Sequence, residues 1–105
     1  MERESLYKRF IKYEWPQQMG NLASTLARLS SLVIDVNYDE ISKKLLREAA
    51  LLIEWSAPKL PEEMQSDLAF IQREICYWSR IPLQPEIRRL LSLRCRSISD
   101  HLLNI

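Results

Sequence analysis

Apolar side chains recur every three or four residues along four long stretches of the chain, with polar side chains between them. This spacing follows the 3.6-residue period of an α-helix and gathers the apolar side chains of each stretch on one face. In chain order, these faces consist of Met19, Leu22, Leu26, Leu29 and Val33; of Ile41, Leu45, Ala49 and Leu52; of Met64, Leu68, Ile71, Ile75 and Trp78; and of Ile87, Leu91, Ile98 and Leu102. The pattern predicts four amphipathic helices of about 18 to 20 residues.

The five prolines mark where these helices begin and end. Pro16, Pro61 and Pro85 stand where an apolar pattern begins, and Pro58 and Pro82 stand where one ends. Proline fits the first turn of a helix, because its missing N–H would be unpaired there in any case, and it disrupts a helix interior. The chain is therefore divided into helices by short connections.

A shorter helix is expected before the four long ones, because Leu6, Phe10 and Tyr13 recur at helical spacing within residues 3–15. The long helices are expected over residues 17–34, from about 39 to 56, from about 61 to 80 and from 85 onward. Short connections place consecutive helices antiparallel. The expected fold is all-α: an antiparallel up-down helical bundle of four long helices with a short N-terminal helix, formed as a single domain by residues 1–105.

A polar segment, residues 35–39, separates the first and second long helices. Asn37 and Asp39 both carry a short side-chain oxygen that can bond the free amides of a first helical turn. We expect one of the two to be the N-cap of the second long helix.

Length, composition and charge limit the class of protein. With 105 residues, of which 47% are hydrophobic and 28% charged, the chain suffices for one globular domain with its own core. Fifteen basic residues against fourteen acidic ones give a net charge of +1. The surface as a whole is therefore not adapted to nucleic acid or to an anionic membrane.

The cysteines and the start of the chain favour a soluble, cytoplasmic protein. Cys76 and Cys95 are isolated thiols, whereas secreted domains of this size are often more heavily cross-linked. Residues 1–5 alternate in charge and do not resemble a signal peptide. No apolar run approaches the roughly 20 residues that a membrane span needs.

The third long helix, expected over residues 61–80, has a second apolar face. Phe70 and Tyr77 are seven residues apart and therefore in line, and they lie about 120° from the Met64-to-Trp78 stripe. Two explanations are open. The helix is wedged between two neighbours of its own chain, or the aromatic pair forms a dimer or partner interface, where aromatic anchors are common.

The first long helix, expected over residues 17–34, carries a strip of small side chains beside its leucines. The strip consists of Gly20, Ala23, Ser24, Ala27 and Ser31. Small side chains let helix backbones approach closely. The strip is explained by packing within the chain or by a symmetric helix-to-helix dimer contact, in which Gly20, Ala23 and Ala27 would lie at the interface.

The C-terminal part of the chain is locally basic. Residues 80–105 hold five arginines, Arg80, Arg88, Arg89, Arg94 and Arg96, against two acids. Residues 35–79 hold nine acids against five bases. The arginines are explained by pairing with the acidic middle helices, by phosphate or nucleic-acid contact, or by an acidic protein partner.

Arg94 and His101 lie seven residues apart at the edge of the last apolar stripe. A charge at such an edge needs a partner, and Glu48, Glu74 or Asp67 is expected to supply it for Arg94. The alternative is that Arg94 and His101 together bind an anion or ligand at a groove. For His101, near the helix end, capping is the simplest expected role.

The sequence contains few residues that could support catalysis or bind a metal. His101 is the only histidine, so the Glu-x-x-His pairs of di-iron bundles and the usual zinc sites are absent. A nucleophile would need a base within hydrogen-bond reach, and the sequence identifies none. We expect no cofactor, no metal and no enzymatic activity.

Three functions are compatible with these features. The first is a cytoplasmic helical interaction or adaptor module that forms a homodimer or binds another protein through Phe70 and Tyr77 or through the small-residue strip. The second is a regulatory nucleic-acid or anion binder that uses Arg88, Arg89 and Arg96, with Arg94 in support. The third is a ligand-binding bundle with Arg94 and His101 facing a pocket.

Overall fold

Five α-helices and two short 3₁₀ helices account for the regular structure of residues 2–105, the part of the chain that the computed structural model describes. The elements are α1 (Glu2–Phe10), α2 (Trp15–Leu32), η1 (Val36–Tyr38), α3 (Asp39–Ser56), η2 (Ala57–Lys59), α4 (Glu62–Arg80) and α5 (Pro85–Leu103). Residues 2–105 contain no β-strand. The prediction of an all-α fold is confirmed.

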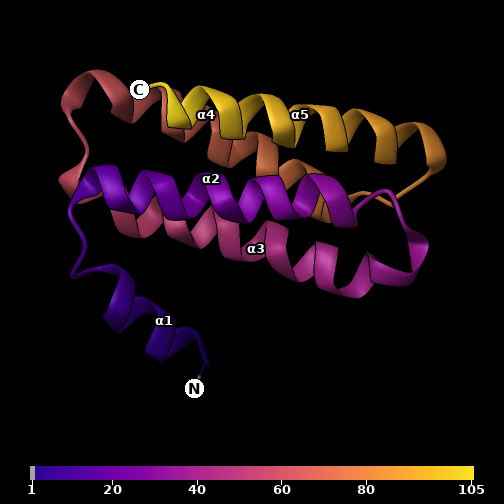
Figure 1. Cartoon of the computed structure of the whole chain (residues 1–105), viewed down its shortest axis with the longest axis horizontal. Coiled ribbons are helices and arrows are strands. Elements are labelled where there is room, and N and C mark those ends of the chain that lie inside the picture. Colours follow the sequence, from indigo (N-terminus) through magenta and orange to yellow (C-terminus); the bar gives the residue numbers. More distant parts are fainter. Residues whose placement is uncertain (1) are drawn as a thin grey trace.

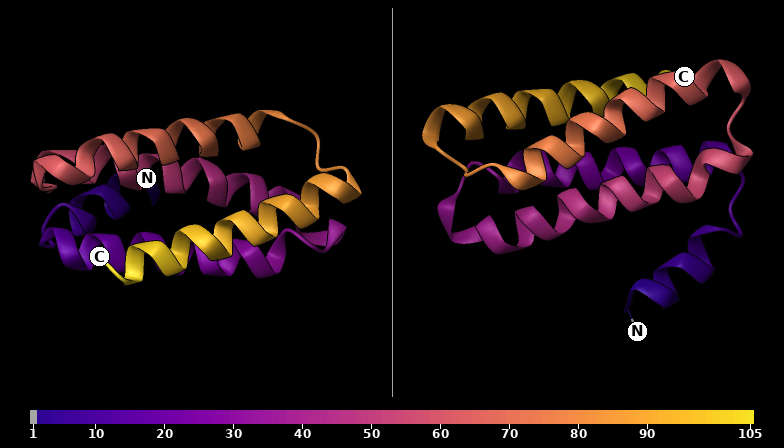
Figure 2. Two further views of the ribbon diagram at one scale, coloured as in Figure 1. Left: turned by 90° about the horizontal axis from the view of Figure 1, so that it is seen from above. Right: turned by 180° about the vertical axis from the view of Figure 1, so that it is seen from behind.

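The four long helices form an antiparallel bundle, and α1 lies outside it on the side of α3 (Figure 1). Helix α2 packs against both α3 and α5, and α3 also packs against α4. The backbones of α4 and α5 approach each other less closely than those of the other neighbours, and their ribbons lie apart in the view from above (Figure 2, left). The bundle therefore has one wide edge, between α4 and α5.

The first helix is shorter than its apolar pattern predicts. Helix α1 ends at Phe10, and Trp15 begins α2 with Pro16 in its first turn, so the prediction that the first helix reaches Trp15 is wrong. Because Pro16 fits only the first turn of a helix, the helix that contains it has to begin just before it. The carbonyls of Ile11 and Tyr13, in the connection, accept hydrogen bonds from Lys59 Nζ, both at 2.7 Å.

The N-cap prediction for the second long helix, α3, is also wrong. Tyr38 occupies the N-cap position of α3 and makes no capping hydrogen bond with its side chain. Asn37 lies within η1 and donates its backbone N–H to Asp35 Oδ1 at 2.9 Å. Asp39 is the first residue of α3, and its carboxylate binds Arg88 of α5 instead of its own helix. Asp39 therefore pairs with a residue distant in the sequence and does not cap α3.

The apolar faces predicted from the sequence meet in one core. Helix α2 lies at its centre, since Leu22, Leu26, Leu29 and Val33 are inaccessible to solvent. The other long helices contribute Leu45, Leu46, Ala49, Leu52, Ile53, Met64, Leu68, Ile71, Ile75, Leu91, Cys95, Ile98 and Leu102. Each large apolar side chain buried in this way stabilises the fold by about 1.5–3 kcal/mol before the loss of chain entropy is counted.

A lysine of α3 terminates α4. Lys43 Nζ donates hydrogen bonds to the carbonyls of Trp78 and Ser79, both at 3.2 Å, and to that of Ile81. These carbonyls belong to the last turn of α4 and the residue after it, where no N–H of the helix itself is available to them. A cation at a helix C-terminus is also favoured by the helix dipole. Lys43 thus fixes the end of α4 against α3.

Candidate interaction surfaces

Phe70 and Tyr77 lie on the protein surface. Their exposed fractions are 55% and 59%, so no other helix of the chain covers the second apolar face of α4. The guanidinium carbon of Arg73 lies 6.0 Å from the centroid of the Phe70 ring, and the Tyr77 ring packs edge-on against Trp78 at 5.9 Å. Of the two explanations for this face, packing within the chain is therefore wrong.

An ion pair and a hydrogen-bonding contact bridge α4 and α5 next to these aromatic side chains. Arg94 donates from Nε to Glu74 Oε2 at 2.6 Å and from Nη2 to Glu74 Oε1 at 2.9 Å. His101 Nε2 lies 2.8 Å from Asp67 Oδ2. The expectation that an acid such as Glu74 would pair with Arg94 is confirmed. The expected capping role of His101 is wrong, because its ring contacts α4 instead.

The hydrogen bond from Arg94 affects the titration of Glu74. It is the largest influence on that carboxyl and lowers its pKa, against the opposing effect of partial burial. The same bond raises the pKa of Arg94. Both groups are therefore charged at neutral pH, and both are engaged with each other. Arg94 and His101 do not form the ligand-binding pair that the sequence left open.

Two exposed leucines lie on α5, the helix next to this aromatic face in the chain. Leu90, 55% exposed, lies one turn before Arg94 on the same side of α5, and Leu93, 64% exposed, lies three residues after Leu90. On α4, Phe70 lies four residues before Glu74 and Tyr77 three residues after it. We call these four residues, Phe70, Tyr77, Leu90 and Leu93, the α4–α5 surface. The sequence did not single out Leu93 at all, because it lies off every apolar stripe.

One side of the small-residue strip of α2 is covered by α5. Ala23 is only 1% exposed, and its carbonyl accepts a hydrogen bond from Ser99 Oγ of α5 at 2.9 Å. Ser92 Oγ binds the carbonyl of Ser30 in the same way, at 2.7 Å. The assignment of Ala23 to a dimer interface is therefore wrong, because α5 already covers it.

Gly20 and Ala27, the other two interface candidates of the strip, are half-buried. A Cβ atom added to Gly20 would meet no heavy atom within 4 Å. Close packing inside the chain therefore does not require a glycine at this position.

The arginines of α5 do not form one surface. Arg88 donates to both carboxylate oxygens of Asp39, at 2.5 and 2.8 Å, and to the carbonyl of Val33 at 3.1 Å. This bond lowers the pKa of Asp39. Because Arg88 links α5 to the connection between α2 and α3, and Arg94 links it to α4, their assignment to anion or nucleic-acid contact is wrong. Only Arg89 and Arg96 of that set are exposed.

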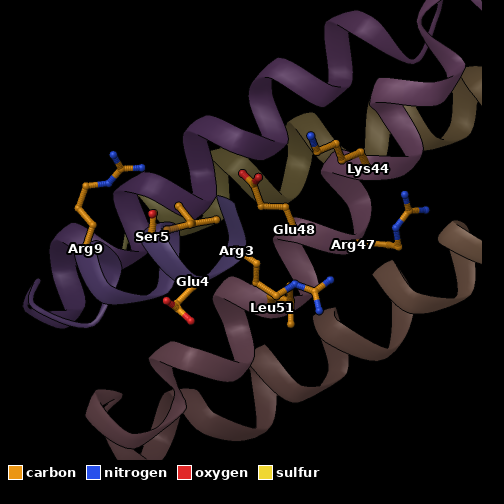
Figure 3. Close-up of a pocket in the computed structure, with 9 residues that line it drawn as sticks. Arg3, Glu4, Ser5, Arg9, Lys44, Arg47, Glu48 and Leu51 are labelled. Carbon is orange, nitrogen blue, oxygen red and sulfur yellow. The ribbon is translucent and has the colours of Figure 1, made fainter. Parts of the chain in front are cut away.

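A groove lies between α1 and α3. It has a volume of about 810 Å³ and is shown in Figure 3. Its walls are formed by Arg3, Glu4, Ser5, Leu6, Arg9, Lys44, Arg47, Glu48 and Leu51. A smaller hollow of about 260 Å³ shares Arg3, Arg47 and Leu51 with it and continues toward α4. The sequence did not reveal this groove, because it depends on where α1 lies.

Aromatic contacts and hydrogen bonds hold α1 against the bundle. The ring of Trp55 in α3 lies 5.1 Å from Tyr7 and 6.2 Å from Phe10. Gln18 Nε2, fully buried, donates to the carbonyl of Phe10 at 3.1 Å. Together with the bonds from Lys59 to the residues after α1, these contacts fix one wall of the groove.

The described residues give little support for metal binding, a reactive thiol or a membrane span. No group of three or more histidine, cysteine or acidic side chains there is placed to hold a metal ion. Burial raises the pKa of the Cys95 thiol to about 12, so this cysteine is protonated at neutral pH. None of the described helices combines the length and the apolar character that crossing a membrane requires.

Comparison of the chain with protein-family models, with curated proteins and with solved structures gives no significant match.

Proposed function

We propose that the protein is a small cytoplasmic interaction module that forms a homodimer through the α4–α5 surface. The observation that carries the proposal is the exposure of Phe70 and Tyr77, two in-line aromatic side chains that the fold of one chain leaves uncovered. Exposed aromatic anchors of this kind are typical of protein interfaces. Leu90 and Leu93 widen the apolar area on the neighbouring helix.

The polar contacts between α4 and α5 support this proposal. Glu74 and Arg94, and likewise Asp67 and His101, join the two helices that carry the exposed apolar side chains. The surface is therefore preorganised, which reduces the entropy lost on association. The two thiols, Cys76 and Cys95, are unpaired in the structure, which suits the reducing conditions of the cytoplasm.

The test is light scattering after size-exclusion chromatography over a range of protein concentrations. The wild-type chain is expected to have about twice the 12.5 kDa mass of the monomer. The double variant Phe70→Ser/Tyr77→Ser is expected to be monomeric, with a dissociation constant raised at least about a hundredfold, since each hot-spot residue contributes about 2 kcal/mol or more. Its helical content and melting temperature should stay close to those of the wild type, because both positions are exposed.

Val36→Ser/Tyr38→Ser is the matched control, because it removes a second exposed apolar pair from η1, away from α4 and α5. This control is expected to remain dimeric. A monomeric wild-type chain at every concentration, or equal loss of the dimer in both double variants, would contradict the proposal.

A further inference from the structure

We propose that the groove between α1 and α3 binds a small organic phosphate monoester, with the phosphate held by Arg3 and Arg47. The groove volume of about 810 Å³ lies within the range of roughly 300–1,000 Å³ that is usual for small-molecule sites. This proposal concerns a different face from the α4–α5 surface and does not depend on self-association.

The charge of the groove favours an anion. Three arginines, Arg3, Arg9 and Arg47, line it together with the carboxylates of Glu4 and Glu48. One of these carboxylates is already engaged within α1, since Glu4 lies 3.6 Å from the Lys8 ammonium. Among these described lining residues, the three guanidinium groups therefore outnumber the carboxylates that remain to pair with them.

Arg3 and Arg47 are the residues placed to share one ligand. Both line the large hollow and its smaller continuation together with Leu51, and Figure 3 shows Arg3 reaching over Leu51 toward Arg47. Neither guanidinium lies within 4.0 Å of a side-chain carboxylate of residues 3–105. Two guanidinium groups match the geometry of a phosphate, which accepts paired hydrogen bonds from each.

The rest of the lining indicates a ligand with an uncharged, partly polar body. The carboxylate of Glu48 lies between α1 and Lys44 in Figure 3, where it would repel a second anionic group and accept a hydrogen bond from a hydroxyl. Ser5 supplies a further hydrogen-bonding group, and Leu6 and Leu51 supply apolar contact. This combination suits a phosphorylated sugar or polyol better than a polyanion.

Isothermal titration calorimetry with glucose 6-phosphate tests the proposal, with glucose and inorganic phosphate as comparison ligands. The wild-type chain is expected to bind glucose 6-phosphate at least tenfold more tightly than either comparison ligand. The double variant Arg3→Gln/Arg47→Gln is expected to lose at least tenfold in affinity. Both side chains lie on the surface, so the variant should keep the helical content of the wild type.

The matched control is Arg89→Gln/Arg96→Gln, which removes the same charge from exposed positions of α5. This control should bind glucose 6-phosphate as the wild type does. Equal weakening in both double variants would show attraction by net charge alone and overturn the assignment. Absence of binding by the wild type, or binding of inorganic phosphate as tight as that of glucose 6-phosphate, would overturn it as well.

Discussion

Arg94 and Glu74 join α5 to α4 through two hydrogen bonds, of 2.6 and 2.9 Å, across the edge of the bundle where the backbones of neighbouring helices approach least closely. Their length and charge allow these side chains to bridge a distance that aliphatic side chains at the same positions would leave open. The pair thus closes the bundle and supports the exposed apolar residues beside it.

The stability contributed by this pair should depend on pH. The pKa of Glu74 is lowered from its ordinary value of 4.5 in the folded chain. The stability that the pair contributes is therefore fully present above pH 4.5 and is lost as the pH falls through the lowered pKa. Glu74→Gln should therefore cost about 1 kcal/mol at pH 7, a value reduced for partial exposure, and much less in strong acid. Urea unfolding at pH 7 and at successively lower pH measures the difference.

Glu54→Gln is the control for this prediction, because Glu54 is exposed and has no ion-pair partner among the described residues. It should change the free energy of unfolding by less than about 0.5 kcal/mol. A pH-independent loss in Glu74→Gln would show that the carboxylate charge is not what stabilises the contact.

Lys43→Met should destabilise the fold by about 2 kcal/mol. The variant keeps the aliphatic stem but leaves the carbonyls of Trp78, Ser79 and Ile81 without their donor, and hydrogen bonds from a charged donor are among the stronger ones. Thermal and urea unfolding measure the change, with the exposed Lys12→Met as the control. Equal stability of the two variants would refute the role of Lys43 at the end of α4.

Gly20→Ala should stabilise the protein by about 0.5–1 kcal/mol. Glycine within a helix carries a larger entropy cost than alanine, and a Cβ at this position meets no other atom. The mass of the assembly should not change, because the proposed dimer uses α4 and α5. A gain in stability accompanied by loss of the dimer would instead place the small-residue strip of α2 at the interface.

Trp55→Ala should release α1 without unfolding the bundle. Its ring is the aromatic contact that α3 makes with Tyr7 and Phe10. Without it, cleavage by trypsin after Arg9 or Lys12 is expected to be at least about tenfold faster, since short segments with few contacts open locally. Limited proteolysis followed by mass spectrometry measures this rate.

Tyr38→Ala is the control for proteolysis, because it removes an exposed aromatic side chain from η1. Its cleavage pattern should match that of the wild type. Unchanged cleavage in Trp55→Ala would mean that Gln18 and Lys59 hold α1 by themselves through their bonds to backbone carbonyls.

The sequence by itself determined which segments are helical and which face of each helix is apolar. The stripe from Met19 to Val33 identified the centre of the core, and the prolines located the helix starts within a few residues. Both signals are local, because periodicity and proline stereochemistry act within one or two helical turns. The need of Arg94 for an acidic partner was likewise visible at its own position on the helix.

Only the tertiary structure decided which faces remain uncovered and which charges find partners. The sequence positions of Phe70 and Tyr77 are compatible with both burial and exposure. Arg88 and Arg89 are likewise indistinguishable in the sequence, and only the fold places Asp39 next to Arg88. The groove between α1 and α3 depends on the position of α1, and this position is fixed by Trp55 and Lys59, which are far from α1 in the sequence. These properties arise from contacts between distant segments, which no local pattern of residues specifies.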